Sequence, residues 1–164
     1  MKIIFVAVFN YNSTNVSQAD GFRKNGCNVI EFNYREIAAR IGDYGRDLEL
    51  VELCKREMPD AVVFSKCNEI MGWAVDECNK ICKTVLWYMD PVNTNFSSSL
   101  VDKINKCNLV FCSIWDAYLK AKAIGGDKVY FLQEGYDHLS NYPIDLPYKY
   151  DVAFIGGLRN KRIE

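Results

Sequence analysis

The sequence predicts an α/β fold in which helices cover both faces of a doubly wound, mostly parallel, Rossmann-like sheet. Short apolar segments rich in β-branched and aromatic residues alternate with helical patterns along most of the 164 residues. Helix-length connections of this kind make successive strands parallel. The central segment, residues 85–89, is apolar throughout and too short for a helix, which is typical of a strand buried on both faces.

Six strands are predicted, at residues 2–9, 28–34, 61–65, 85–89, 109–114 and 128–132. If they follow the common Rossmann-type order 3-2-1-4-5-6, the first and fourth strands are neighbours where the winding reverses. Ligands of open parallel sheets bind at that point, beyond the carboxyl ends of the strands. This order predicts that the loop after the first strand and Asp90 face one crevice, with Glu134 arriving from the sixth strand.

A helix is expected between each pair of strands. The first helix stops at Gly26, the usual residue just past a helix C-terminus. The second, residues 35–58, is interrupted by Gly42 and Gly45 and is expected as two pieces. The third places one apolar face toward the sheet, made of Met71, Ala74, Val75, Cys78 and Cys82.

The last two helices have their own start and stop signals. Ser99 and Asp102 resemble a capping box with Asp in place of the usual Glu or Gln. The buried stripe behind this cap is Leu100, Ile104 and Cys107. The fifth helix ends at the glycine pair 125–126, and its inward side chains are Ala117, Tyr118, Ala121 and Ile124.

The regular alternation stops after Gly135, so residues 1–135 are predicted as one domain. Residues 136–150 contain two prolines and no helical or strand period, which indicates a linker. A seventh strand is predicted at residues 152–155, and glycines and basic residues follow it. Residues 151–164 therefore predict the opening of a second nucleotide-binding unit.

Composition excludes several classes of partner. Twenty basic residues against 21 acidic ones give a net charge of -1, which leaves no basic excess for nucleic acid. No apolar stretch approaches the roughly 18 residues of a membrane span, and no cleavage site follows the apolar N-terminus. Seven cysteines and no export signal favour reduced thiols in a cytoplasmic protein. Cys78 and Cys82, one helical turn apart, suit core packing better than half a metal site, so no metal is expected.

A family resemblance begins at residues 151–164, DVAFIGGLRNKRIE. This segment resembles the linker and first strand of the second domain in GT-B glycosyltransferases, especially the CgeB or spore-maturation type of glycosyltransferase-like proteins. Earlier segments are similar in the same order. DGFRKNGCNVIEF looks like the family's helix, glycine and second strand, WYMDP like its strand ending in Asp-Pro, and GGDKVYFLQEGYD like the segment before the crossover.

The resemblance implies two Rossmann-like domains that face each other across a cleft. The amino-terminal domain binds the acceptor and the carboxyl-terminal one binds the nucleotide sugar, usually without a metal. This chain would then be the acceptor-side domain, inactive without the remaining carboxyl-terminal domain, and its only cofactor-like molecule would be the nucleotide-sugar co-substrate. Gly156, Gly157 and Arg159 would lie at the donor diphosphate.

Three residues are candidates for catalysis. Asp90, which ends a strand before Pro91, could accept the proton of an attacking sugar hydroxyl, or it could simply cap a turn. Glu134 follows the sixth strand, and a strand end holds it more rigidly than a linker would. His138, the single histidine, could serve as a base near neutral pH, although an exposed linker histidine is the commoner case.

The acceptor is expected to meet the loop after the first strand. Asn10, Asn12, Ser13 and Thr14 offer amide and hydroxyl groups suited to sugar hydroxyls, as does the neighbouring Asn15. A solvated polar loop is the plain alternative, and the absence of G-x-G-x-x-G disfavours a dinucleotide site there. The tryptophans at 73, 87 and 115 are interpreted mainly as core, although one could form a sugar-stacking platform.

Two other classes stay open. One is a non-catalytic Rossmann-like module that binds a ligand or regulates a partner. A response-regulator-like version is disfavoured because Asn10 and Tyr11 follow the first strand, where an acidic pair would be expected. The other is an interaction module within a larger protein. A second α/β unit after Glu164 would separate the glycosyltransferase hypothesis from both.

Overall fold

The computed structural model describes residues 1–11, 13–92, 95–138, 141–147 and 149–153. The strands are β1 (Lys2–Ala7), β2 (Asn28–Asn33), β3 (Ala61–Ser65), β4 (Lys83–Tyr88), β5 (Leu109–Cys112) and β6 (Val129–Phe131). The helices are α1 (Thr14–Lys24), α2 (Tyr34–Glu57), α3 (Gly72–Asn79), α4 (Ser98–Lys106) and α5 (Trp115–Gly125), and a 3-10 turn, η1 (Gly126–Lys128), precedes β6. The predicted α/β class is confirmed.

All six strands form one parallel sheet in the order β2-β1-β3-β4-β5-β6. The expectation that the first and fourth strands are neighbours is wrong, because β3 lies between them. After β2 the chain returns through α2 to the other side of β1 without adding a strand outside β2. The winding therefore reverses between β1 and β3, and the ligand crevice of such a sheet is expected at their carboxyl ends.

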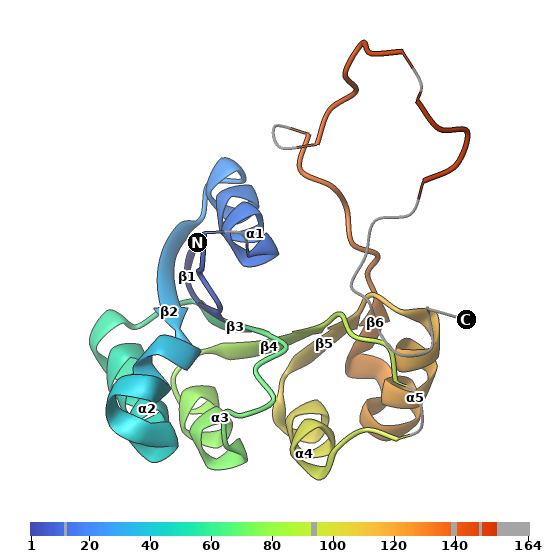
Figure 1. Ribbon diagram of the computed structural model, residues 1–164. Helices are drawn as coiled ribbons and strands as arrows, with labels where there is room; N and C mark the ends of the chain where they lie inside the picture. Colours follow the sequence, from blue (N-terminus) through green and yellow to red (C-terminus); the bar gives the residue numbers. More distant parts are fainter. Residues whose placement is uncertain (12, 93–94, 139–140, 148, 154–164) are drawn as a thin grey trace.

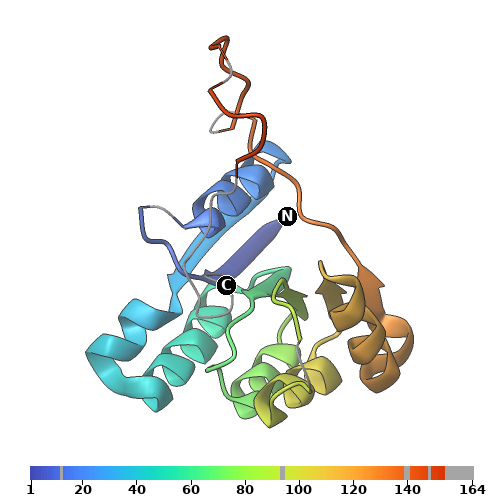
Figure 2. The ribbon, with the colours of Figure 1, turned by 45° about the vertical axis from the view of Figure 1, so that its right-hand side comes forward.

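The helices cover the two faces of the sheet unequally. Helices α2 to α5 lie on one face, and of the helices in the described residues only α1 lies on the other (Figures 1 and 2). The larger core is formed between the sheet and α2 to α5. The smaller core lies between α1 and the first and third strands, and its centre is Phe5, which makes edge-to-face contacts with Phe9 and Phe22.

This unequal cover is visible along β4. Thr84, Leu86 and Tyr88 are buried, whereas Val85 and Trp87, which point to the α1 face, are only partly buried. The prediction of a strand buried on both faces is therefore wrong for β4. An unbroken apolar run does not reveal that one face lacks a covering helix.

The helix boundaries mostly follow the sequence signals. Gly42 has φ 78° and ψ 168°, so it divides α2 into the two expected pieces, and a left-handed φ of this kind suits glycine. The prediction that Ser99 caps α4 is wrong, because the side chain that accepts from Leu100 N is that of Ser97. Ser99 Oγ instead donates to the carbonyl of Asn68.

Three residues predicted to face the core do not. Met71 is 52% exposed because it is the cap residue that precedes α3, and Ile124 is 37% exposed near the end of α5. Trp115, which begins α5, is 55% exposed and packs beside Tyr118 and Phe131 instead of entering the core. In each case the residue lies at a helix end, where the helical period no longer fixes the direction of the side chain.

The segment after β6 contains no helix or strand in residues 132–138, 141–147 and 149–153. It rises on the same side of the sheet as α1 (Figures 1 and 2). Val152 is 88% exposed and lies outside any strand. The rest of the predicted strand at 152–155 lies outside the described residues.

Buried thiols make the stability of the fold sensitive to alkaline pH. Burial raises the pKa of Cys107 to about 12 and that of Cys112 to about 11. Above about pH 9 the unfolded state loses these protons while the folded state keeps most of them until the pH nears the raised pKa. The free energy of unfolding should therefore fall, by up to about 1.4 kcal/mol per pH unit for each thiol. Urea unfolding at several pH values measures this decline.

A double variant, Cys107→Ala with Cys112→Ala, provides the control. Its free energy of unfolding should be lower at pH 7, but it should fall less steeply above pH 9. Equal slopes for the variant and the wild type would show that these two thiols do not cause the decline.

Candidate functional site

A cavity of about 800 Å³ lies on the α1 side of the sheet. One wall is α1, the other is the segment after β6, and Trp87 of β4 lies between them. The lining side chains and glycines from α1 are Thr14, Ser17, Gln18, Gly21, Phe22 and Lys24, with Asn25 after them. Those from the opposite wall are Glu134, Gly135, Tyr136, Asp137, His138 and Asn141.

Trp87 reaches this cavity because of the alternation in β4. Leu86 and Tyr88 point to the large core, so the residue between them points to the α1 face. The indole Nε1 of Trp87 donates to Ser113 Oγ at 3.1 Å, which fixes the orientation of the ring. The cavity therefore combines an oriented aromatic ring with walls that carry hydroxyl, amide and carboxylate groups beside apolar surface.

Hydrogen bonds from Asn15 hold α1, and with it one wall, on the sheet. The Asn15 Nδ2 group donates to Ser65 Oγ and to Gln18 Oε1, both at 2.7 Å, and its Oδ1 accepts from Val8 N at 3.3 Å. Gln18 Nε2 in turn lies 3.2 Å from the sulfur of Met89. One amide thus joins the carboxyl ends of β1 and β3, where the winding of the sheet reverses.

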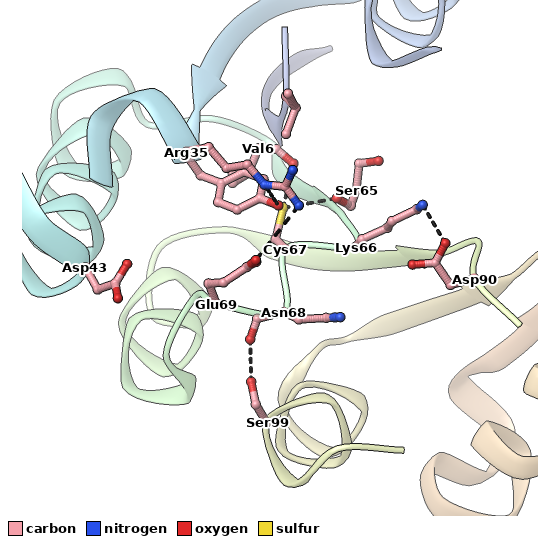
Figure 3. Close-up of polar contacts among 12 residues, drawn as sticks. Val6, Arg35, Asp43, Ser65, Lys66, Cys67, Asn68, Glu69, Asp90 and Ser99 are labelled. Carbon is pink, nitrogen blue, oxygen red and sulfur yellow. Dashed lines mark hydrogen bonds and ion pairs between the residues drawn. The ribbon is translucent and has the colours of Figure 1, made fainter. Parts of the chain in front are cut away.

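A charged pair lies beside this network, at the ends of β3 and β4 (Figure 3). Lys66 Nζ and Asp90 Oδ1 are 2.6 Å apart, and both side chains are a little less than half exposed. Lys66 has φ 64° and Cys67 has φ 50°, so two consecutive non-glycine residues occupy the left-handed region. Strained backbone of this kind persists where surrounding contacts impose it, and it is common at functional sites.

Buried polar side chains hold the backbone of Lys66 and Cys67 in this conformation. The thiol of Cys67 donates to the carbonyls of Val6 and Ser65, at 3.0 and 3.2 Å. The fully buried Lys103 donates to the carbonyl of Asn68 at 2.9 Å, and burial lowers the pKa of its ammonium. The loop that begins with Lys66 is therefore held from β1 and from α4.

Helix α2 fixes the far end of the same loop. Arg46, 1% exposed, donates to the carbonyl of Glu69 at 2.7 Å and to the Oδ1 of Asp47 at 2.7 Å. Asp47, 0% exposed, accepts from the backbone N–H of Met71 at 2.9 Å. Burial raises the pKa of the Asp47 carboxyl, and the bonds from Met71 and Arg46 oppose that shift.

The structure brings together some of the predicted site residues. Thr14, Glu134 and His138 line the same cavity. Asp90 does not line it and is paired with Lys66 at the neighbouring strand ends. Asn10 and Ser13 serve the start of α1, since the carbonyl of Asn10 accepts from Ser13 N and Ser13 Oγ accepts from Asn15 N.

Four predicted residues lie outside the part of the chain that the structure describes. They are Asn12, Gly156, Gly157 and Arg159. Within the described part, no three metal-ligating side chains of His, Cys, Asp or Glu lie close enough to hold a metal ion. No helix in that part has the length and apolar character needed to cross a membrane.

Sequence reasoning missed two features of the site. The sequence predicts Trp87 mainly in the core, and the unbroken apolar run around it holds no signal that this face of β4 is partly open. Lys66 follows the third strand directly, and Asp90 comes shortly after the fourth. That placement predicts a pair once β3 and β4 are known to be neighbours.

No protein-family model matches the chain, and a search of curated proteins gives no match.

Proposed function

We propose that this chain is the acceptor-binding part of a GT-B type glycosyltransferase and that a carbohydrate acceptor occupies the cavity beside α1. The observation that carries the proposal is the placement of Trp87 between two walls that carry hydroxyl, amide and carboxylate groups. The apolar face of a sugar ring stacks on an aromatic side chain, and its hydroxyl groups need hydrogen-bonding partners around the rim. The cavity offers both.

The carboxylate best placed to activate an acceptor is Glu134, because it lines the cavity together with Trp87. His138 lines the same wall and is the second candidate for accepting the proton that a sugar hydroxyl loses on transfer. Asp90 and Lys66 form an ion pair at the adjacent strand ends. In this proposal a carboxyl-terminal domain would bind the nucleotide sugar. We assign the Lys66–Asp90 pair to the end of the acceptor site that faces that nucleotide sugar.

Calorimetric titration of the 164-residue chain tests the proposal. The ligands are a panel of neutral glycans and, separately, a panel of nucleotide sugars. We expect saturable glycan binding, since the cavity has an aromatic face with polar groups around it. We expect no nucleotide-sugar binding, since Lys24 is the only lysine or arginine among the described lining residues.

Two outcomes would contradict this assignment. Tight nucleotide-sugar binding would make the cavity a nucleotide site and would favour a regulatory or cofactor-binding module. Failure of every glycan to bind would remove the acceptor role from the cavity. A Thr14→Ala variant tests whether the glycan binds in this cavity. It removes a lining hydroxyl at the first position of α1 and leaves the Ser13 cap in place.

A further inference from the structure

Three aromatic side chains lie side by side on the face of the sheet that α1 leaves open. Trp87, Phe111 and Tyr130 are register partners across β4, β5 and β6, so their side chains project on the same side. The rings of Phe111 and Tyr130 are 5.7 Å apart at their centroids and inclined by 32°. Tyr130 is 47% exposed. We call Trp87, Phe111 and Tyr130 the aromatic row.

The row is open because of the unequal helix layers. Helix α1 packs on β1 and β3, and in the described part of the chain no helix lies over β5 and β6 on this face (Figure 2). Leu109, which precedes Phe111 by two residues in β5 and so lies on the same face, is also 36% exposed. On the opposite face, Val110, Cys112 and Val129 are buried in the large core.

The aromatic row continues from the cavity. Trp87 belongs to both, so a ring that stacks on Trp87 in the cavity lies at one end of the row. Adjacent strands are about 4.8 Å apart, so the row extends over about 10 Å. No member of the row is charged, and the chain has a net charge of -1, which disfavours a phosphate backbone as the ligand.

We infer that the aromatic row binds an oligosaccharide whose successive rings stack on Trp87, Phe111 and Tyr130. The acceptor is then a carbohydrate chain of at least three units and not a single sugar. This inference rests on the proposed function, because it assigns the ring in the cavity to the same acceptor. Aromatic rings in a row favour a carbohydrate over an aliphatic partner, since sugar rings present flat C–H faces to them.

A length series tests the inference. The probes are linear β-1,4-glucose, β-1,4-N-acetylglucosamine and α-1,4-glucose oligomers of one to six units, titrated by NMR for weak ligands and by calorimetry for tight ones. For the series that binds, affinity should rise roughly three- to tenfold for each of the second and third units. Tyr130→Ala should remove the last increment and leave the affinity for the single sugar unchanged.

Three controls accompany the series. Tyr130→Phe keeps the ring and should keep the increment. Tyr44→Ala removes an exposed aromatic side chain from α2, on the other face of the sheet, and should change nothing. Urea unfolding of each variant shows that the fold is retained.

Several results would overturn the inference. Equal affinities for one and three units, or a Tyr130→Ala variant that equals the wild type, would reject the row and leave the single-sugar site of the proposed function intact. Failure of all three series at every length would reject both. Sedimentation that shows a wild-type dimer which Tyr130→Ala separates would identify the row as a contact between two copies of the chain.

Discussion

Replacing Asp47 with alanine is expected to lower the free energy of unfolding by about 3–5 kcal/mol. Asp47 is fully buried and bonded to the guanidinium of Arg46 and to the backbone of Met71. Its removal leaves a buried positive charge with one exposed carboxylate, that of Asp43, and one carbonyl, that of Glu69. The loss of one partner from a buried pair costs this much because the other charge remains desolvated. Equilibrium urea unfolding at pH 7 measures it.

A matched control lies on the same helix. Lys55 and Glu52 form an exposed pair on α2, with side chains 55% and 63% exposed, so Glu52→Ala should change the free energy of unfolding by less than about 1 kcal/mol. Asp47→Asn retains an oxygen that can accept from Met71 N and should lose less than Asp47→Ala. Equal losses for Asp47→Ala and Glu52→Ala would show that the buried pair does not stabilise the fold.

Replacing Trp87 with alanine is expected to weaken glycan binding about 10- to 100-fold. The change removes the aromatic surface that lies between the two walls of the cavity, together with the apolar area that a sugar would cover. Calorimetric titration of the variant with the glycan that binds the wild type measures the loss. The direction should be the same for every glycan in the panel that binds.

Two milder variants separate the ring from its hydrogen bond. Trp87→Phe keeps an aromatic face but loses the indole N–H, and it should retain most of the affinity. Ser113→Ala removes only the acceptor of that N–H and should reduce affinity slightly, through a less fixed ring. Wild-type affinity in Trp87→Ala, with the fold intact by urea unfolding, would remove Trp87 from the acceptor site.

Much of the fold could be predicted from local patterns. The position of β3 was predicted to the residue, and Gly42 correctly marked the break in α2. The strand order could not be predicted in the same way, because it depends on where a crossover lands and not on any single segment. The standard order placed β1 beside β4, and the error displaced the expected crevice by one strand.

Part of the site could be predicted, because Thr14, Glu134 and His138 are predicted site residues that line the cavity. Glu134 and Asp90 both follow strands, and the structure places Glu134 at the cavity and Asp90 beside Lys66. The rest of the α1 wall could not be predicted, because the lining residues Ser17, Gln18 and Gly21 form no motif. They face a cavity only because a segment far along the chain lies opposite them, and such a contact leaves no local signal.

The solitary position of α1 has a consequence for how the cavity opens. Cooperative units of a protein that share few buried contacts open at a lower free energy than the rest of the molecule. Within α1, Ala19 is the one fully buried residue. The helix is held on the sheet by Ala19, by the contact of Phe22 with Phe5 and by the hydrogen bonds of Asn15. Helix α1, which forms one wall of the cavity, is therefore expected to open at a lower free energy than helices α2 to α5 on the other face of the sheet. If a glycan binds the cavity as proposed, it should slow the amide hydrogen exchange of α1 more than that of α2 to α5.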